Sequence, residues 1–163
     1  MVRAAGDELV RRLASREISS TQNTERGPES AEALKELGTE FFHAGKLTAA
    51  GSYYRRAIQA KPDFAEAHNN LGTVLRKQAR PQSAIAAFQT ALMLNPQSGY
   101  TSGNLGNLYE RYGNLAQAET YYLKAVALSS DLYQGFVGLA RIAASRQRWD
   151  EALNMCLHVT RQR

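Results

Sequence analysis

Apolar residues in the chain recur with the spacing of one face of an α-helix, in short stretches that come in pairs. Residues 65–98 contain two such faces, the first formed by Leu71, Val74 and Leu75 and the second by Ala84, Ile85, Phe88, Ala91 and Leu92. Pro81 lies between them and suits the first turn of a helix, where a missing N–H costs nothing. The pattern therefore predicts pairs of amphipathic helices, separated in the neighbouring stretches at Gly45-Lys46 and Gly113-Asn114.

The pair pattern recurs with a period of 34 residues, as Leu37-Gly38, Leu71-Gly72, Leu105-Gly106 and Leu139-Ala140 show. Further positions recur in the same register: Phe41, Leu75, Tyr109 and Ala143; Ala50, Ala84, Ala118 and Ala152; Tyr54, Phe88, Tyr122 and Cys156; Ala57, Ala91, Ala125 and Val159; Pro62 and Pro96. A helix pair of this size cannot bury its apolar face alone, so we expect successive pairs to stack.

The residues at these positions resemble the tetratricopeptide repeat family over about residues 31–163, with a degenerate fourth repeat. The resemblance implies an all-α fold, a right-handed superhelical solenoid of antiparallel helix pairs with about 3.5–4 repeats. The repeats would span residues 31–64, 65–98, 99–132 and 133–163. Gly72 and Ala84 are small where two helices approach closely, and Phe88 is expected to fill the space between them.

Polar residues mark the expected helix starts. Ser30 is predicted to cap the first helix of the solenoid. Two capping boxes are predicted for later helices, Asp63 with Glu66 and Asp131 with Gln134. Residues 1–30 form an extension, in which residues 3–18 either make an amphipathic helix over the first repeat or stay frayed, and residues 19–30 read as a polar linker.

The net charge of +5 permits contact with anionic partners without requiring it. Basic tracts with interleaved exposed aromatic residues are absent, so nucleic-acid binding is not expected. No apolar run is long enough for a membrane span, and the N-terminus has neither the apolar core of a signal peptide nor the acid-poor composition of a mitochondrial presequence. The single cysteine excludes an intrachain disulfide and suits a reducing compartment, so a cytoplasmic location is expected.

Residue types that carry catalysis or metal binding do not cluster in the sequence. His43, His68 and His158 stand in separate repeats, with no acidic or cysteine partner at metal-ligand spacing. The glycines occupy repeat positions rather than a phosphate-binding loop. Cys156 replaces a repeated aromatic residue and is expected to pack rather than react. We therefore expect no catalytic site, no cofactor and no metal, and the chain is predicted not to be an enzyme.

The family resemblance implies a concave groove lined by the first helix of each repeat, at its second, fifth, sixth, ninth, twelfth and thirteenth positions. The residues predicted there are Lys35, Thr39, Asn69, Asn70, Thr73, Lys77, Asn104, Asn107, Arg111 and Arg141. Asparagine carries both donors and an acceptor, so a row of them can hydrogen-bond the backbone of an extended peptide. Asn70, Asn104 and Asn107 resemble a short asparagine ladder of the O-linked GlcNAc transferases, interrupted at Glu36 and Gly138.

A second family mode, the two-carboxylate clamp for chaperone tails, is not matched. Its five positions correspond to Lys35, Thr39, Asn70, Tyr100 and Asn104, of which only Lys35 and Asn70 agree. Two of the three cations that would hold a carboxylate are missing, so chaperone-tail binding in that form is not expected.

The last predicted helix carries an apolar ridge of Trp149, Leu153 and Leu157. An apolar ridge of this kind usually marks an interface, either with a second copy in a homodimer or with a further part of a longer protein. The alternative is that the ridge folds inward.

The function predicted from these features is a non-catalytic protein-interaction scaffold that binds a peptide or partner segment, favouring an acidic one through Lys77, Arg111 and Arg141. Two alternatives stay open. One is the regulatory or substrate-docking region of a larger glycosyltransferase, and the other is an assembly factor of a bacterial envelope machine.

Overall fold

The computed structural model describes residues 30–129 and 133–161, with side chains described up to residue 157. The amphipathic helix predicted at 3–18, nearly all of the linker predicted at 19–30, and the Asp131 half of one capping box lie outside these residues.

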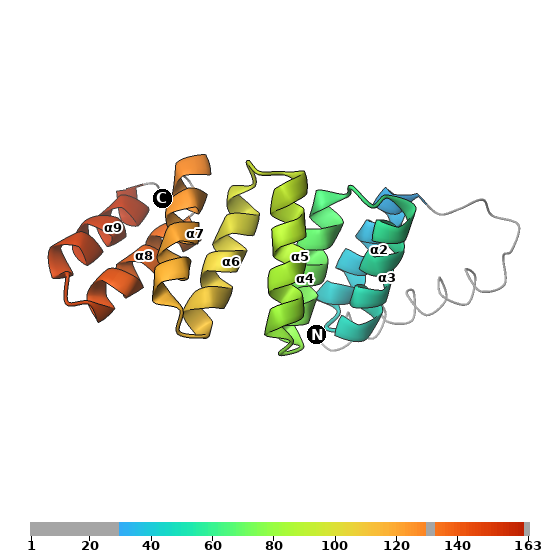
Figure 1. Cartoon of the computed structure of the whole chain (residues 1–163), viewed down its shortest axis with the longest axis horizontal. Coiled ribbons are helices and arrows are strands. Elements are labelled where there is room, and N and C mark those ends of the chain that lie inside the picture. Colours follow the sequence, from blue (N-terminus) through green and yellow to red (C-terminus); the bar gives the residue numbers. More distant parts are fainter. Residues whose placement is uncertain (1–29, 130–132, 162–163) are drawn as a thin grey trace, which may run out of the picture.

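Eight α-helices make up the described part of the chain, and no strand occurs there. They are α2 (Ala31–His43), α3 (Leu47–Ala60), α4 (Ala65–Lys77), α5 (Pro81–Leu94), α6 (Gly99–Arg111), α7 (Leu115–Leu128), α8 (Tyr133–Ser145) and α9 (Trp149–Arg161). The first helices of successive pairs begin 34 residues apart, and so do the second helices. The pairs stand side by side along the long axis of the molecule, from α2–α3 at one end to α8–α9 at the other (Figure 1). The predicted all-α repeat solenoid is confirmed.

The turn inside each helix pair has one residue with a positive φ, and that residue stands at the same place in all four repeats. It is Gly45 at 75°, Ala79 at 55°, Gly113 at 79° and Gln147 at 61°. Glycine adopts this left-handed conformation without a steric cost, whereas Ala79 and Gln147 do not. The repeat geometry therefore imposes one turn conformation even where the sequence has lost the glycine.

Helix starts agree only in part with the predicted caps. The Ser30 hydroxyl accepts a hydrogen bond of 3.1 Å from the backbone N–H of Ala33, as predicted, and Pro81 stands in the first turn of α5. The capping box of Asp63 and Glu66 is wrong, because α4 begins one residue later, with Phe64 as its N-cap and no side-chain hydrogen bond to that cap. Glu66 instead forms an ion pair with Lys35 of α2.

The core runs through the stack as three clusters, and each joins one repeat to the next. The first contains Phe41, Tyr53 and Tyr54 with Val74 of α4; the second contains Phe88 and Leu92 with Leu105 and Leu108 of α6; the third contains Tyr122 with Leu139 and Ile142 of α8. Because every cluster crosses a repeat boundary, the stability of each pair depends on its neighbour.

Small residues allow close approach within each pair, as expected for Gly72 and Phe88. A Cβ built on Gly72 would lie 2.7 Å from the Phe88 ring. Gly106 stands in the same relation to Tyr122. In the fourth pair the corresponding residues are Ala140 and Cys156, and Cys156 is exposed, so its predicted packing role is wrong. The smaller cysteine does not reach across the pair as an aromatic ring does.

Candidate peptide-binding pocket

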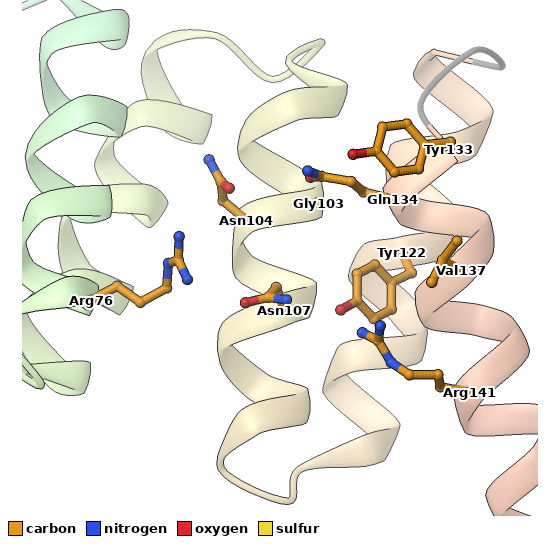
Figure 2. A pocket seen from close by; sticks show the side chains of 9 residues that line it. All are labelled: Arg76, Gly103, Asn104, Asn107, Tyr122, Tyr133, Gln134, Val137 and Arg141. Carbon is orange, nitrogen blue, oxygen red and sulfur yellow. The ribbon is translucent and has the colours of Figure 1, made fainter. Parts of the chain in front are cut away.

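A pocket of about 340 Å³ lies on the first helices of three successive pairs, α4, α6 and α8 (Figure 2). We call it the α4–α6–α8 pocket. Its lining residues are Arg76, Gly103, Asn104, Asn107, Tyr122, Tyr133, Gln134, Val137 and Arg141. Of the residues predicted to face the groove, it contains Asn104, Asn107 and Arg141.

The ring of Tyr122 fixes the distance between α6, α7 and α8 at this pocket. The backbone of Gly138 lies against the ring, and a Cβ at residue 138 would overlap it. A Cβ on Gly106 would also meet the ring, at 2.7 Å. Gly138 is where the predicted asparagine ladder is interrupted, and the reason is steric: an asparagine at that place would displace Tyr122.

Three asparagine amides form a hydrogen-bonded row from α6 to α4. Asn104 Nδ2 donates to Asn69 Oδ1 over 3.0 Å, and Asn69 Nδ2 donates to Asn70 Oδ1 over 3.3 Å. Asn70 and Asn104, two of the three amides predicted as a ladder, are therefore partly occupied by hydrogen bonds with Asn69. These contacts hold the side chains in place, and each amide keeps further donor or acceptor capacity, because an amide has two donors and an oxygen that accepts twice.

The charge of Arg141 is used inside the protein. Its Nε and Nη2 each donate a hydrogen bond of 2.7 Å to the Glu110 carboxylate. The Tyr122 hydroxyl donates a third bond, 2.6 Å long, to the same carboxylate. These donors, the Arg141 bonds first, lower the pKa of Glu110, while burial and the bond to Glu110 raise the pKa of Tyr122. Arg141 lines the pocket as a neutralised ion pair.

Arg76 lies on the other side of α6 and reaches from α4 toward Asn104 and Asn107 (Figure 2). It is partly buried, and its Nε is buried with no hydrogen-bond partner. Within residues 30–129 and 133–161, no carboxylate forms an ion pair with it. Burial, and then the positive charge of Arg111, lower the pKa of the guanidinium.

The sequence-based choice of groove residues missed Arg76, although a signal for it was present. Arg76 stands at the twelfth position of its repeat, one of the positions that the family resemblance assigns to the groove. Tyr133, Gln134 and Val137 of α8 also line the pocket and were not selected.

The remaining predicted groove residues lie outside the pocket. Lys35 forms an ion pair of 3.1 Å with Glu66, and the Thr39 and Thr73 hydroxyls each donate to a backbone carbonyl of their own helix. Lys77 is exposed with its Nζ 5.4 Å from the centre of the Phe42 ring, and Arg111 is exposed. Of the predicted cations, Lys77 and Arg111 are thus exposed, and neither lines the pocket.

The predicted ridge on α9 is exposed. Trp149 is 64% exposed, Leu153 59% and Leu157 43%. The alternative, that the ridge folds inward, does not hold for Trp149 and Leu153, whose side chains mostly face solvent.

No three histidine, cysteine, aspartate or glutamate side chains in the described part of the chain come together as metal ligands would. None of its helices has the length and apolar character needed to cross a membrane.

Comparison with solved structures shows the same fold in other proteins. A crystal structure of MamA has a TM-score of 0.77 at 20% identity, covering 99% of this chain and 90% of that chain. A structure of Pseudomonas aeruginosa pilF has a TM-score of 0.80 at 21% identity, covering 98% and 74%. Cut9 in the APC/C hetero-tetramer Cut9–Hcn1 has a TM-score of 0.77 at 21% identity, covering 89% and 28%. At these identities the likeness concerns the fold alone.

No curated protein matches this chain closely enough to count as a relative.

Family models identify the sequence more directly. The model described as tetratricopeptide repeat matches residues 63–131, and the model described as TPR repeat matches residues 38–78. The two matches overlap and together run from residue 38 to residue 131, which includes the pocket residues of α4, α6 and α7. The chain belongs to the tetratricopeptide repeat family.

Proposed function

We propose that this chain is a non-catalytic interaction module that holds an extended segment of a partner protein along α4, α6 and α8. The fold is that of a protein-interaction scaffold, and the observation that carries the finer proposal is the row of amides from Asn70 through Asn69 to Asn104 beside the pocket. Amides that are already held in position bind an extended backbone with little further loss of side-chain freedom.

A main-chain binding mode fits the composition of the pocket. Asparagine and glutamine side chains, Asn104, Asn107 and Gln134, provide both donors and acceptors in it, and Tyr133 and Val137 provide apolar contact. An extended segment has unpaired N–H and C=O groups along its whole length, so alternating donors and acceptors suit its backbone more than any particular side chain.

The test is selection from a displayed random-peptide library on the purified chain, followed by affinity measurements on the selected peptides. Asn70→Ala with Asn104→Ala should weaken the binding of selected peptides about tenfold, the loss of about two hydrogen bonds, while the far-ultraviolet circular dichroism stays unchanged. The matched control is Gln59→Ala with Gln89→Ala, which removes two exposed amides from the outer helices α3 and α5. Equal affinities of the two double variants would contradict the groove assignment.

A second surface of the same module is the α9 ridge of Trp149, Leu153 and Leu157. The second helix of each earlier pair packs on the first helix of the next, as α3 on α4, α5 on α6 and α7 on α8. Within the described residues no helix occupies the corresponding face of α9. The exposure of three large apolar side chains there supports a homodimer in which two copies of α9 pack on each other in a two-fold contact.

The two broader assignments remain subordinate proposals. A regulatory or substrate-docking region of a larger glycosyltransferase is supported only by the asparagine row. That row is shorter than a continuous ladder, because it is confined to α4 and α6. An assembly role is supported by the general use of this fold, since one similar structure is part of a hetero-tetramer. A reducing, cytoplasmic setting is proposed from the cysteine content alone.

A further inference from the structure

The cations at the α4–α6–α8 pocket differ in whether their charge is already used. Arg141 has a full bidentate partner in Glu110 at 2.7 Å on both bonds. Arg76 has no ion pair within the described part of the chain, and its buried Nε has no hydrogen-bond partner. A buried donor that loses its water without gaining a partner is unfavourable. Arg148 Nε is in the same state, but the Arg148 guanidinium is paired with Glu119 and Glu151, whereas Arg76 lines a pocket and has no ion pair among the described residues.

The surroundings of Arg76 make this arrangement costly for the free protein. Arg111 on α6 is the charge that acts on it most, and it is another cation. The carboxylate of Glu110 is held by two pocket residues, Arg141 and Tyr122, and is not available to Arg76. An anion from outside would relieve both the missing hydrogen bond and the repulsion.

We infer that Arg76 binds the side-chain carboxylate of an aspartate or glutamate in the partner segment. This inference rests on the proposed function and names the chemistry of the segment. A guanidinium presents a planar fork of donors that matches the two oxygens of a carboxylate, and a charge-assisted bond of this kind is stronger than one between neutral groups. Asn104 and Asn107 beside it then contact the backbone on either side of the acidic residue.

An acidic side chain fits this chain better than a chain end as the source of the carboxylate, because two of the three cations of the family's clamp for a chain end are missing here. Lining residues continue from Arg76 on α4 across α6 to Tyr133, Gln134 and Val137 on α8, so a segment bound at Arg76 also lies against the helices on the far side (Figure 2). The acidic residue is therefore expected inside a segment that runs from Arg76 across α6 to α8.

The experiment selects peptides from a displayed random library on wild type and on Arg76→Gln. Wild type should enrich peptides with aspartate or glutamate at one fixed position, and Arg76→Gln should lose that preference. Synthetic copies of the selected peptides should bind Arg76→Gln about ten- to a hundredfold more weakly than wild type. The matched control is Arg55→Gln on the outer helix α3, an exposed arginine whose loss changes net charge equally. It should bind like wild type.

Three further results decide the inference. Changing the enriched aspartate or glutamate to its amide should weaken binding to wild type and leave binding to Arg76→Gln unchanged, which assigns the contact to this pair. A C-terminal amide on the peptide should have no effect, whereas a large loss would mean that a chain end is bound and would overturn the inference. The unfolding midpoint of Arg76→Gln should equal or exceed that of wild type, because the substitution removes an uncompensated charge; a marked loss would show a structural role instead.

Failure of this inference is distinguishable from failure of the proposed function. Enriched peptides without an acidic position, or equal affinity of selected peptides for wild type and Arg76→Gln, would overturn the carboxylate contact and leave peptide binding intact. A folded wild type that enriches no peptide at all would overturn the proposed function, and the inference with it.

Discussion

The backbone of Gly138 lies directly against the ring of Tyr122, so that any side chain at residue 138 would overlap the ring. Tyr122 is 1% exposed and donates a hydrogen bond to Glu110, which in turn binds Arg141. One close contact between α7 and α8 thus fixes the place of a buried tyrosine, of the carboxylate it holds and of the arginine on the next helix.

Gly138→Ala is expected to destabilise the protein. Alanine favours a helix by about 1 kcal/mol over glycine, but overpacking a rigid buried ring costs about 1–3 kcal/mol, so the steric cost prevails. Urea unfolding measures the difference. Gly51→Ala is the matched control, because a Cβ there would lie 3.4 Å from Val74, an ordinary contact, and the variant should be equally or more stable than wild type. A Gly138→Ala variant as stable as Gly51→Ala would contradict the packing.

Glu110→Gln is expected to lower the free energy of unfolding by about 1–2 kcal/mol. The amide loses the charge that Arg141 pairs with, and Arg141 is half exposed, so water replaces part of the lost interaction. Chemical denaturation of Glu110→Gln, Arg141→Gln and the double variant gives the coupling between them. If the two single effects simply add, the ion pair contributes nothing to stability.

Acid should remove the contribution of the same pair. The hydrogen bonds from Arg141, with that from Tyr122, hold the pKa of Glu110 below its ordinary value of 4.5 in the folded protein. The unfolded chain therefore takes up this proton first as pH falls, so the stabilisation is present above about pH 4.5 and is lost as pH drops through the folded-state pKa. Unfolding free energies measured against pH should fall less steeply for Glu110→Gln than for wild type. Glu119, whose pKa is lowered by its hydrogen bond from Arg146, still titrates in wild type and in Glu110→Gln. The variant Glu119→Gln is therefore the matched comparison, because it removes a different ion-paired carboxylate and keeps Glu110.

Ala79→Gly is expected to stabilise the protein by about 0.5–1 kcal/mol. Ala79 has a φ of 55° in the turn between α4 and α5, where a Cβ is strained and glycine is not. The control is Ala86→Gly, an exposed site inside α5, where the same substitution should cost about 1 kcal/mol. Thermal unfolding of both variants should move the midpoint in opposite directions; shifts of the same sign would mean that the turn is not strained.

The α9 ridge should control the oligomeric state. Wild type is expected to self-associate as its concentration rises, and Leu153→Glu with Leu157→Glu should be a folded monomer, because burying two carboxylates in the contact is unfavourable. Light scattering across a concentration series measures this, with circular dichroism as the check on folding. A wild type that stays monomeric throughout would rule out the homodimer and leave the ridge to another protein.

The amino-acid sequence by itself determined the architecture of this protein. The 34-residue period places glycine or alanine at one position of each repeat and an aromatic residue at another. This pattern predicts helix pairs that stack, because the apolar faces of one pair are buried only against the next pair. It also predicted a groove along the first helix of each pair, and three of the residues named for that groove, Asn104, Asn107 and Arg141, line the α4–α6–α8 pocket. Helix pairs and groove positions recur in every repeat, so they can be predicted from the amino-acid sequence.

Only the tertiary structure decided which of those residues are available. Arg141 and Arg76 look alike in the sequence, but Arg141 pairs with Glu110 of the neighbouring repeat, whereas Arg76 has no ion pair among the described residues and its pKa is lowered by burial and by the like charge of Arg111. The amides of Asn69 and Asn104 are 35 residues apart and meet in one hydrogen bond. Ion pairs and amide hydrogen bonds depend on differences of a few ångströms in the distance between side chains of different helices. A repeat pattern predicts which face of each helix is buried but not those distances. Contacts between repeats therefore decide which polar groups in the pocket are available, whereas the residue pattern within each repeat determines the fold.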